Sequence, residues 1–247
     1  MVHDARAGVA AWMRTFARLM RAEAFRIAHG RGVWAALVVM GCMIGGAVVS
    51  REGASGFGLS IAVVLVVCIP LTCANDLDAG GMKSLLVGAH ARTAYVAVLV
   101  VLAVGLGLAG TGVARLAVTI AGALGYGDGV KTSNGAWMAW TVLYVLIYVT
   151  PALWVAILTR SQPFATLVAF LVASPIPWTI LADGLDALGW KGLSRWMWEQ
   201  YPLGMEPGYE AVLPNEGIWI IAGAGIVVWT ALSLWAMGRR DVSVHGE

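Results

Sequence analysis

Six apolar stretches, each close to the length that crosses a membrane as a helix, constrain this chain more than any other feature. A helix needs about 20 mainly apolar residues to cross the hydrocarbon core of a bilayer. None of the six stretches has the alternating pattern of a membrane β-strand. The sequence therefore predicts an all-α integral membrane protein in which residues 1–247 form a single transmembrane domain with six spans, at 33–50, 57–74, 93–112, 137–159, 164–182 and 217–238.

Composition supports this class and excludes others. Hydrophobic residues make up 60% of the 247 residues and charged residues only 12%, whereas a soluble domain carries about 25% charged residues. A soluble fold of this size could not bury so much apolar surface, which excludes a soluble globular protein, a disordered chain and a nucleic-acid-binding protein. The three cysteines lie in apolar runs and the four histidines lie outside them. We therefore expect no metal site and no cofactor bound by this chain.

The distribution of Lys and Arg predicts the orientation, because cytoplasmic loops of membrane proteins are enriched in both residue types. With the N-terminus inside, eleven of them lie in the cytoplasm: Arg6, Arg14, Arg18, Arg21, Arg26, Arg31, Lys83, Arg92, Arg160, Arg239 and Arg240. Five lie outside: Arg51, Arg115, Lys131, Lys191 and Arg195. We therefore expect a multi-pass protein of the cell membrane with both termini in the cytoplasm.

The third and fourth spans each leave two interpretations open. Apolar character continues from the third span to about Leu124, so this helix is longer than the membrane is thick and must tilt or protrude. Arg115 then either extends its side chain to the outer interface or faces a substrate pathway. Four aromatic residues of the fourth span either pack within the bundle or face a ligand: Trp137, Trp140, Tyr144 and Tyr148.

Residues 10–29 have the pattern of an amphipathic helix that precedes the first span. Its apolar face follows helical spacing, interrupted only by a glutamate, along Trp12, Phe16, Leu19, Glu23 and Ile27. A basic stripe, which would face anionic headgroups, consists of Arg14, Arg18 and Arg21. We expect this helix to lie in the plane of the inner membrane interface. It is either a plain anchor or an elbow helix that also contacts a cytoplasmic partner.

The loop at residues 76–90, between the second and third spans, has the features of a short helix with an exposed apolar face. Asp76 or Asp78 can cap such a helix at its start. One side of it would carry, at three- and four-residue spacing, Met82, Leu85 and Leu86. In the cytoplasm, such a face either binds a groove on another protein or packs beneath its own bundle.

Nothing in the sequence predicts an enzyme. The run from Gly80 to Ser84 is glycine-rich and contains Lys83, but Met82 stands where a phosphate loop requires its second glycine. An intramembrane protease would need paired catalytic side chains at depth, and the spans contain no such constellation. We therefore expect no catalytic residues and no ATPase activity in this chain.

The fifth span and the segment after it are interrupted. Pro175 and Pro177 should end or kink the helix. Residues 183–216 are too polar to span a membrane and too apolar to lie free in water, so we expect short re-entrant helices in the outer leaflet, with their backbone covered by protein. Together with the two prolines, their aromatic residues would form an extracellular gate: Trp190, Trp196, Trp198 and Tyr201.

Over nearly the whole chain, these elements resemble the permease subunit of ABC transporters of the type-2 exporter class. The likeness consists of an elbow helix, six spans, a coupling helix after the second span and re-entrant helices before the sixth. The coupling region of that family has an acid, a glycine, a Leu-Leu pair and a basic residue, matched here by Asp76 or Asp78, Gly80 or Gly81, Leu85-Leu86 and Arg92. The acid is usually Glu, so Asp is a departure. The ending at 239–242 is also similar.

The resemblance implies partner subunits for this chain rather than a catalytic activity of its own. Two permease subunits, identical or different, would surround the substrate pathway among membrane lipids. Two separate ATPase subunits, which bind ATP and Mg²⁺, would contact Asp76, Asp78, Gly80, Gly81, Met82, Lys83, Leu85 and Leu86. Small permeases of this kind resemble the lantibiotic-immunity and bacitracin-resistance exporters, so the expected substrate is a membrane-active peptide antibiotic or another amphipathic compound.

The alternative function is a secondary transporter or a channel of unknown substrate. Such proteins usually need ionisable groups or broken helices near the middle of the membrane to couple ion movement. Charged residues are absent from the spans 33–50, 57–74, 137–159 and 217–238. Arg115 gives this alternative its main support.

Overall fold

The structure, a computed structural model, describes residues 2–30, 34, 37–38, 41–42, 69–77, 89–125, 134–173, 176–200 and 216–239. All regular secondary structure within these ranges is helical, which confirms the predicted all-α class. The helices are α1 (Val2–His29), α4 (Ala89–Ala123), α5 (Asn134–Thr159), α6 (Gln162–Ala173), α7 (Ile176–Ala187), α8 (Lys191–Gln200) and α9 (Glu216–Arg239). Residues 69–77 are helical as well.

Two of the described helices are long and apolar enough to cross a membrane. They are Ala91–Ala117 within α4 and Thr141–Thr159 within α5, which coincide with the third and fourth predicted spans. The predicted span at 217–238 lies within the 24 residues of α9. Most of the predicted span at 33–50, and residues 57–68 of the second, lie outside the described residues.

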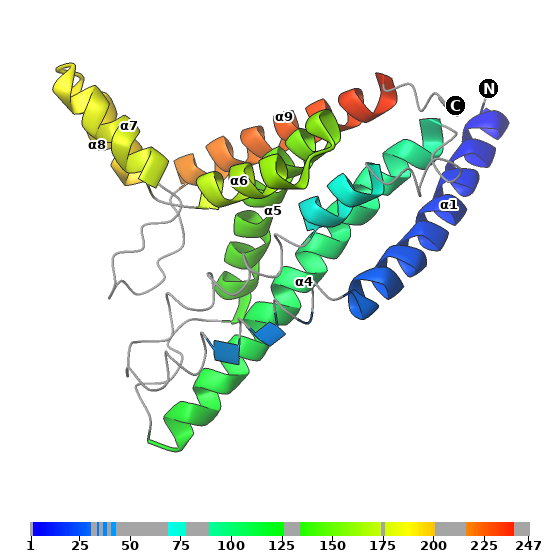
Figure 1. Cartoon of the computed structure of the whole chain (residues 1–247), viewed down its shortest axis with the longest axis horizontal. Helices are drawn as coiled ribbons and strands as arrows, with labels where there is room; N and C mark the ends of the chain where they lie inside the picture. The colour runs from blue at the N-terminus through cyan, green and yellow to red at the C-terminus, as the bar shows by residue number, and fades with distance from the viewer. Residues whose placement is uncertain are drawn as a thin grey trace.

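The helix α4 is continuous over 35 residues. At a rise of 1.5 Å per residue it is about 50 Å long, which exceeds the hydrocarbon thickness of a bilayer. The helix therefore continues well past the predicted end of the third span at Gly112, whereas the candidate span within it ends at Ala117. Figure 1 shows this end of α4 reaching beyond the other described helices, and its apolar side chains there are exposed: Val113, Leu116, Ile120 and Leu124.

The helix α5 lies at the centre of the bundle. It packs against α4, α6 and α9, and contributes Val145, Leu153 and Ile157 to the buried core (Figure 1). Trp154 of α5 lies against Trp229 of α9, with ring centroids 5.2 Å apart. Of the four aromatic residues predicted either to pack or to face a ligand, Tyr148 is buried, and the side chains of the other three lie outside the described part of the structure.

The helix α1 buries its predicted apolar face against α4. Leu19 and Ile27 belong to the core, and Trp12 and Phe16 pack against it with their rings stacked at 5.3 Å. Figure 1 shows α1 beside the first part of α4, and the hydrogen bonds of Trp12 and Arg26 both lead to the first turns of that helix, at Thr93 and, through Asp76, at Tyr95. The predicted position of this helix in the plane of the inner membrane interface stays a prediction. The amphipathic pattern identified the buried face, but this face packs on protein.

The predicted interruption of the fifth span coincides with a helix boundary. The stretch 164–182 is divided between α6, which ends at Ala173, and α7, which begins at Ile176. Pro177 is the second residue of α7, where the missing N–H of proline removes no helical hydrogen bond. Each helix has 12 residues, about 18 Å, which is too short to cross a bilayer alone.

The helices α7 and α8 form a hairpin that packs mainly on itself and extends away from the bundle (Figure 1). Gly189, with φ of +82°, turns the chain between them. The N–H of Gly189 donates to the carbonyl of Asp186 at 2.9 Å, and that of Trp190 to the carbonyl of Leu185 at 2.8 Å. This is the Schellman pattern, which satisfies the last carbonyls of α7.

Candidate functional site

Four polar side chains from three separate segments meet at one end of the bundle. We call Glu23 and Arg26 of α1, Asp76 of residues 69–77 and Tyr95 of α4 the polar cluster. Arg26 Nη1 donates hydrogen bonds to Asp76 Oδ2 at 3.0 Å and to Glu23 Oε1 at 3.1 Å, and Arg26 Nη2 donates to Asp76 Oδ1. The Tyr95 hydroxyl donates to Asp76 Oδ2 at 2.6 Å. Asp76 thus links α1 to α4.

The polar cluster is mostly removed from solvent. Glu23 and Tyr95 are 0% exposed and Asp76 is 6% exposed, whereas the Arg26 side chain remains 43% exposed. Burial, followed by the negative charge of Asp76, raises the pKa of Glu23 from 4.5 to about 7, against the opposing effect of Arg26. The hydrogen bond with Asp76 raises the pKa of Arg26 above its ordinary value, so Arg26 stays charged.

Further hydrogen bonds bring the ends of three helices together beside the polar cluster. Trp12 Nε1 donates to Thr93 Oγ1 at 3.3 Å, which joins α1 to the start of α4. Arg92 Nη1 donates to the carbonyl of Gly238 at 3.3 Å, which joins the start of α4 to the end of α9. Residues 69–77, the start of α4 and the end of α9 therefore lie at the same end of the bundle, along α1.

The residues predicted for the elbow helix separate into two faces. On one face, Trp12 and Phe16 are partly buried and Glu23 is fully buried. Glu23, the residue that interrupts the apolar face, is thus the point where this face meets the polar cluster. The basic stripe is exposed, as predicted, and consists of Arg14, Arg18 and Arg21. Arg26 and Tyr95 were not predicted as site residues from the sequence. The spacing of Arg26, one helical turn after Glu23, is the signal that could have identified it.

Only one residue of the predicted ATPase contact lies among the described residues. Asp76 was expected to face a partner, but its buried carboxylate binds Arg26 and Tyr95 of the same chain. The rest of the predicted contact lies outside the described residues: Asp78, Gly80, Gly81, Met82, Lys83, Leu85 and Leu86.

The predicted extracellular gate is described in part. Trp190, between α7 and α8, is 60% exposed. Pro177, Trp196 and Trp198 lie on these two helices, but their side chains lie outside the described part of the structure. Pro175 and Tyr201 also lie outside it.

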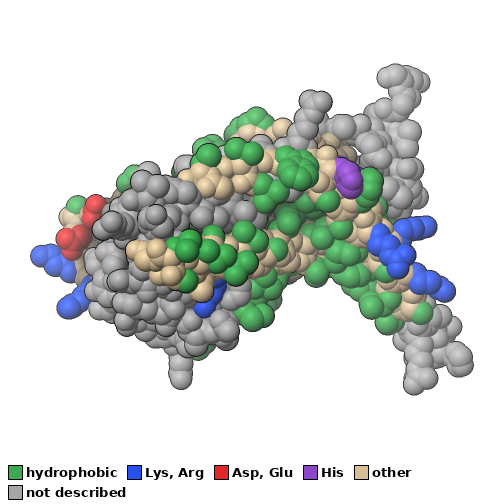
Figure 2. Space-filling view, turned by 90° about the horizontal axis from the view of Figure 1, so that it is seen from below, with side chains coloured by type: hydrophobic (Ala, Val, Ile, Leu, Met, Phe, Trp, Pro, Cys, Tyr) green, Lys and Arg blue, Asp and Glu red, His purple; other side chains and the backbone are tan. Residues whose placement is uncertain are grey.

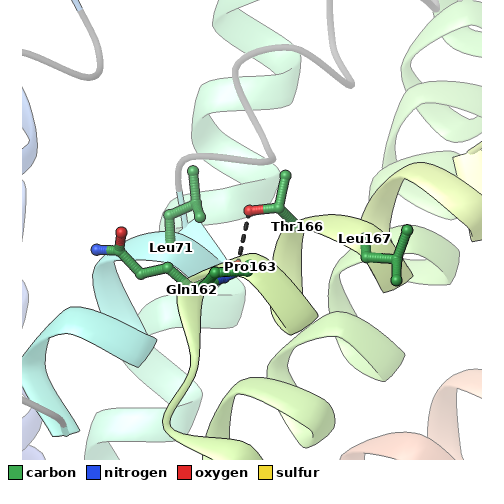
Figure 3. A pocket seen from close by; sticks show the side chains of 5 residues that line it. All are labelled: Leu71, Gln162, Pro163, Thr166 and Leu167. Carbon is green, nitrogen blue, oxygen red and sulfur yellow. Dashed lines mark hydrogen bonds between the residues drawn. The ribbon is translucent and has the colours of Figure 1, made fainter.

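An open hollow of about 510 Å³ lies where residues 69–77 meet the start of α6 (Figure 3). It is lined by Leu71, Gln162, Pro163, Thr166 and Leu167. Thr166 Oγ1 donates to the carbonyl of Gln162 at 2.8 Å, so this hydroxyl is used within α6. The mostly apolar lining offers no charged group to a ligand.

Within the described ranges, no three His, Cys, Asp or Glu side chains lie close enough together to hold a metal ion. Comparison with known proteins adds no relative, because no family model and no curated protein matches this sequence. The polar cluster is therefore the site on which the functional argument rests. Its hydrogen bonds connect α1 and α4 to the segment that leads into residues 78–88.

Proposed function

We propose that this chain is the membrane-spanning permease subunit of an ATP-driven exporter of the ABC type-2 class. The observation that carries the proposal is the anchoring of residues 69–77 by Asp76 to both α1 and α4. The loop expected to contact the ATPase, residues 76–90, begins at Asp76. Because Asp76 fixes this segment to two helices, a force that an ATPase exerts on the loop would move α1 and α4 rather than deform the loop alone.

The arrangement of the helix ends supports the proposed topology of six spans with both termini in the cytoplasm. The start of α4 and the end of α9 are joined by Arg92 and Gly238, and α1 lies beside them. Residues 75–92 and both ends of the chain should share one side of a membrane in this topology. In Figure 2, charged side chains gather at the two ends of the molecule, with hydrophobic side chains along the length between them.

The α7–α8 hairpin supports the second part of the proposal, a re-entrant extracellular segment. It exposes Leu188 and Trp190 together with charged residues such as Asp186 and Lys191. Such a mixed surface suits the boundary between lipid and water. We propose that Trp190, Trp196 and Trp198 on this hairpin, with Tyr201, close the pathway from the outside.

Charge placement favours this function over an ion-coupled transporter. The candidate span Ala91–Ala117 has its charged residues, Arg92 and Arg115, close to its two ends, and Thr141–Thr159 has none. Coupling to an ion gradient usually needs an ionisable group near the middle of the membrane. Among the substrate classes, we propose a membrane-active peptide antibiotic or a similar amphipathic compound, because the hairpin would meet such compounds at the outer leaflet.

Co-purification tests the proposed function. Full-length protein extracted from its native membrane should retain an ATP-hydrolysing subunit in a stoichiometric complex with two permease subunits. The purified complex should hydrolyse ATP, and the substrate should stimulate this hydrolysis. A chain that transports substrate in proteoliposomes without any ATPase would contradict the proposal and favour the secondary transporter.

A further inference from the structure

The polar cluster contains one more carboxylate than it has cations. Glu23 and Asp76 share the single guanidinium of Arg26. Three of the hydrogen bonds of the polar cluster end on Asp76, two from Arg26 and one from Tyr95, whereas Glu23 receives one. Hydrogen-bond donors therefore offset the negative charge of Asp76 more fully than that of Glu23. The excess negative charge of the polar cluster lies on Glu23.

The surroundings of Glu23 disfavour that charge. The residue is fully buried, and its Oε2 atom has no hydrogen-bond partner within the described part of the chain. An ionised carboxylate with an unpaired oxygen in the interior is much less favourable than the neutral acid. Among the described residues, the charged or titratable groups around it are Arg26 on α1, Asp76 and Cys73 from residues 69–77, and Tyr95 from α4. Only Arg26 is a cation, and Asp76 already engages it.

We propose that the contact between α1, residues 69–77 and α4 binds one proton on the Glu23 carboxyl near neutral pH, and releases it when α1 and residues 69–77 separate. On separation, water reaches Glu23, its O–H bond breaks, and the proton passes to bulk water while the carboxylate becomes solvated. The polar cluster is thereby a proton-linked latch between the N-terminal helix and the segment that leads into residues 78–88. This role does not depend on an ATPase partner.

The pH dependence of the latch has a defined direction and magnitude. Glu23 in the closed contact has its pKa raised to about 7, against an ordinary value of 4.5. Acid therefore favours the closed contact, because only the closed form holds the proton between these values. By linkage, the ratio of closed to open contact should fall about tenfold between about pH 6 and about pH 8.

Infrared difference spectroscopy of the full-length protein in lipid nanodiscs measures directly whether the Glu23 carboxyl is protonated. Between about pH 6 and about pH 8, the wild-type protein should lose the carbonyl band of a neutral carboxylic acid. The midpoint should lie near pH 7, and isotope-labelled glutamate should shift the band. Glu23→Gln should abolish the band, and Asp183→Asn, at an exposed acid of α7, should leave it unchanged. No titrating band in the wild type, or its persistence in Glu23→Gln, would overturn the proposal.

A second variant keeps the test decisive if Glu23→Gln folds poorly. Asp76→Asn removes the neighbouring negative charge and releases Arg26 to Glu23, so the midpoint of the band should move to lower pH. An unchanged midpoint would contradict a proton on Glu23. A monovalent cation is the competing occupant: if sodium or potassium chloride, but not choline chloride, suppresses the band at about pH 6, the site holds a metal cation instead.

Discussion

Arg26 of α1 and Asp76 of residues 69–77, which are 50 positions apart in the chain, form a two-pronged ion pair. The planar guanidinium matches the two carboxylate oxygens, a geometry that lysine cannot reproduce. Tyr95 fixes the same carboxylate from α4. The pair therefore joins three segments, and its removal should affect stability in a way that depends on which partner is lost.

Arg26→Gln should destabilise the protein more than Asp76→Asn. The first leaves two buried carboxylates without a cation, whereas the second leaves Arg26 free to pair with Glu23. For Arg26→Gln we expect a loss of about 1.5–3 kcal/mol in the free energy of unfolding, the range for hydrogen bonds to charged groups. Denaturant unfolding in bicelles measures this, with Arg18→Gln on the exposed face of α1 as the matched control. Equal effects of the two variants would show that the carboxylates are not competing for Arg26.

Glu23 should make stability depend on pH in a defined window. Because its pKa is higher in the folded protein, the folded state holds the proton more tightly than the unfolded chain. The stability difference between wild type and Glu23→Gln should shift against the wild type as pH rises from about 4.5 through about 7, by at most about 3 kcal/mol, and level off above about pH 8. A flat difference across this window would contradict the assignment.

Gly189 should be required for the α7–α8 turn. Its φ of +82° is unfavourable for any residue with a Cβ atom, so Gly189→Ala should destabilise the hairpin by about 1 kcal/mol. Gly184→Ala, inside α7 and facing open space, should instead stabilise it by a similar amount. Hydrogen exchange of residues 176–200 measures both, because the hairpin packs mainly on itself. Faster exchange in both variants would point to a general effect of adding a methyl group.

The proposed topology predicts opposite labelling of two positions. In a variant without the native cysteines, a cysteine at Ser84 should react with an impermeant reagent only after the cells are opened. A cysteine at Glu210 should react from outside in intact cells. Labelling of Ser84 from outside would reverse the orientation derived from the Lys and Arg counts.

Local pattern predicted those parts of the fold that depend on neighbours in sequence. Unbroken apolar character predicted the length of α4, Pro175 and Pro177 predicted the boundary between α6 and α7, and helical spacing predicted the buried face of α1. Each of these follows from contacts within a few turns or from the properties of a single residue type.

The polar cluster could be predicted only in part. Glu23 stood out because it interrupts an apolar face, but Asp76, the ion-pair partner of Arg26, lies 50 residues beyond that arginine, and no periodicity relates the two segments. Asp76 was expected to contact an ATPase because of the resemblance to the permease family, and its burial against Arg26 and Tyr95 of the same chain was not predicted. The packing of the apolar face of α1 on protein was not predicted, since an amphipathic pattern does not distinguish lipid from protein as the apolar phase.

The most direct test of the proposed function is the binding of the ATPase by Leu85→Asp. Leu85 belongs to the proposed coupling face, and burying a leucine stabilises a contact by about 1.5–3 kcal/mol, which a buried aspartate would lose while adding a desolvated charge. Leu188→Asp, at an exposed leucine of the α7–α8 hairpin, makes the same chemical change away from the proposed contact. We predict that well-expressed Leu85→Asp protein fails to retain the ATPase, or retains it without substrate-stimulated hydrolysis, while Leu188→Asp retains it normally. Undiminished binding and unchanged stimulated hydrolysis in Leu85→Asp would contradict the account.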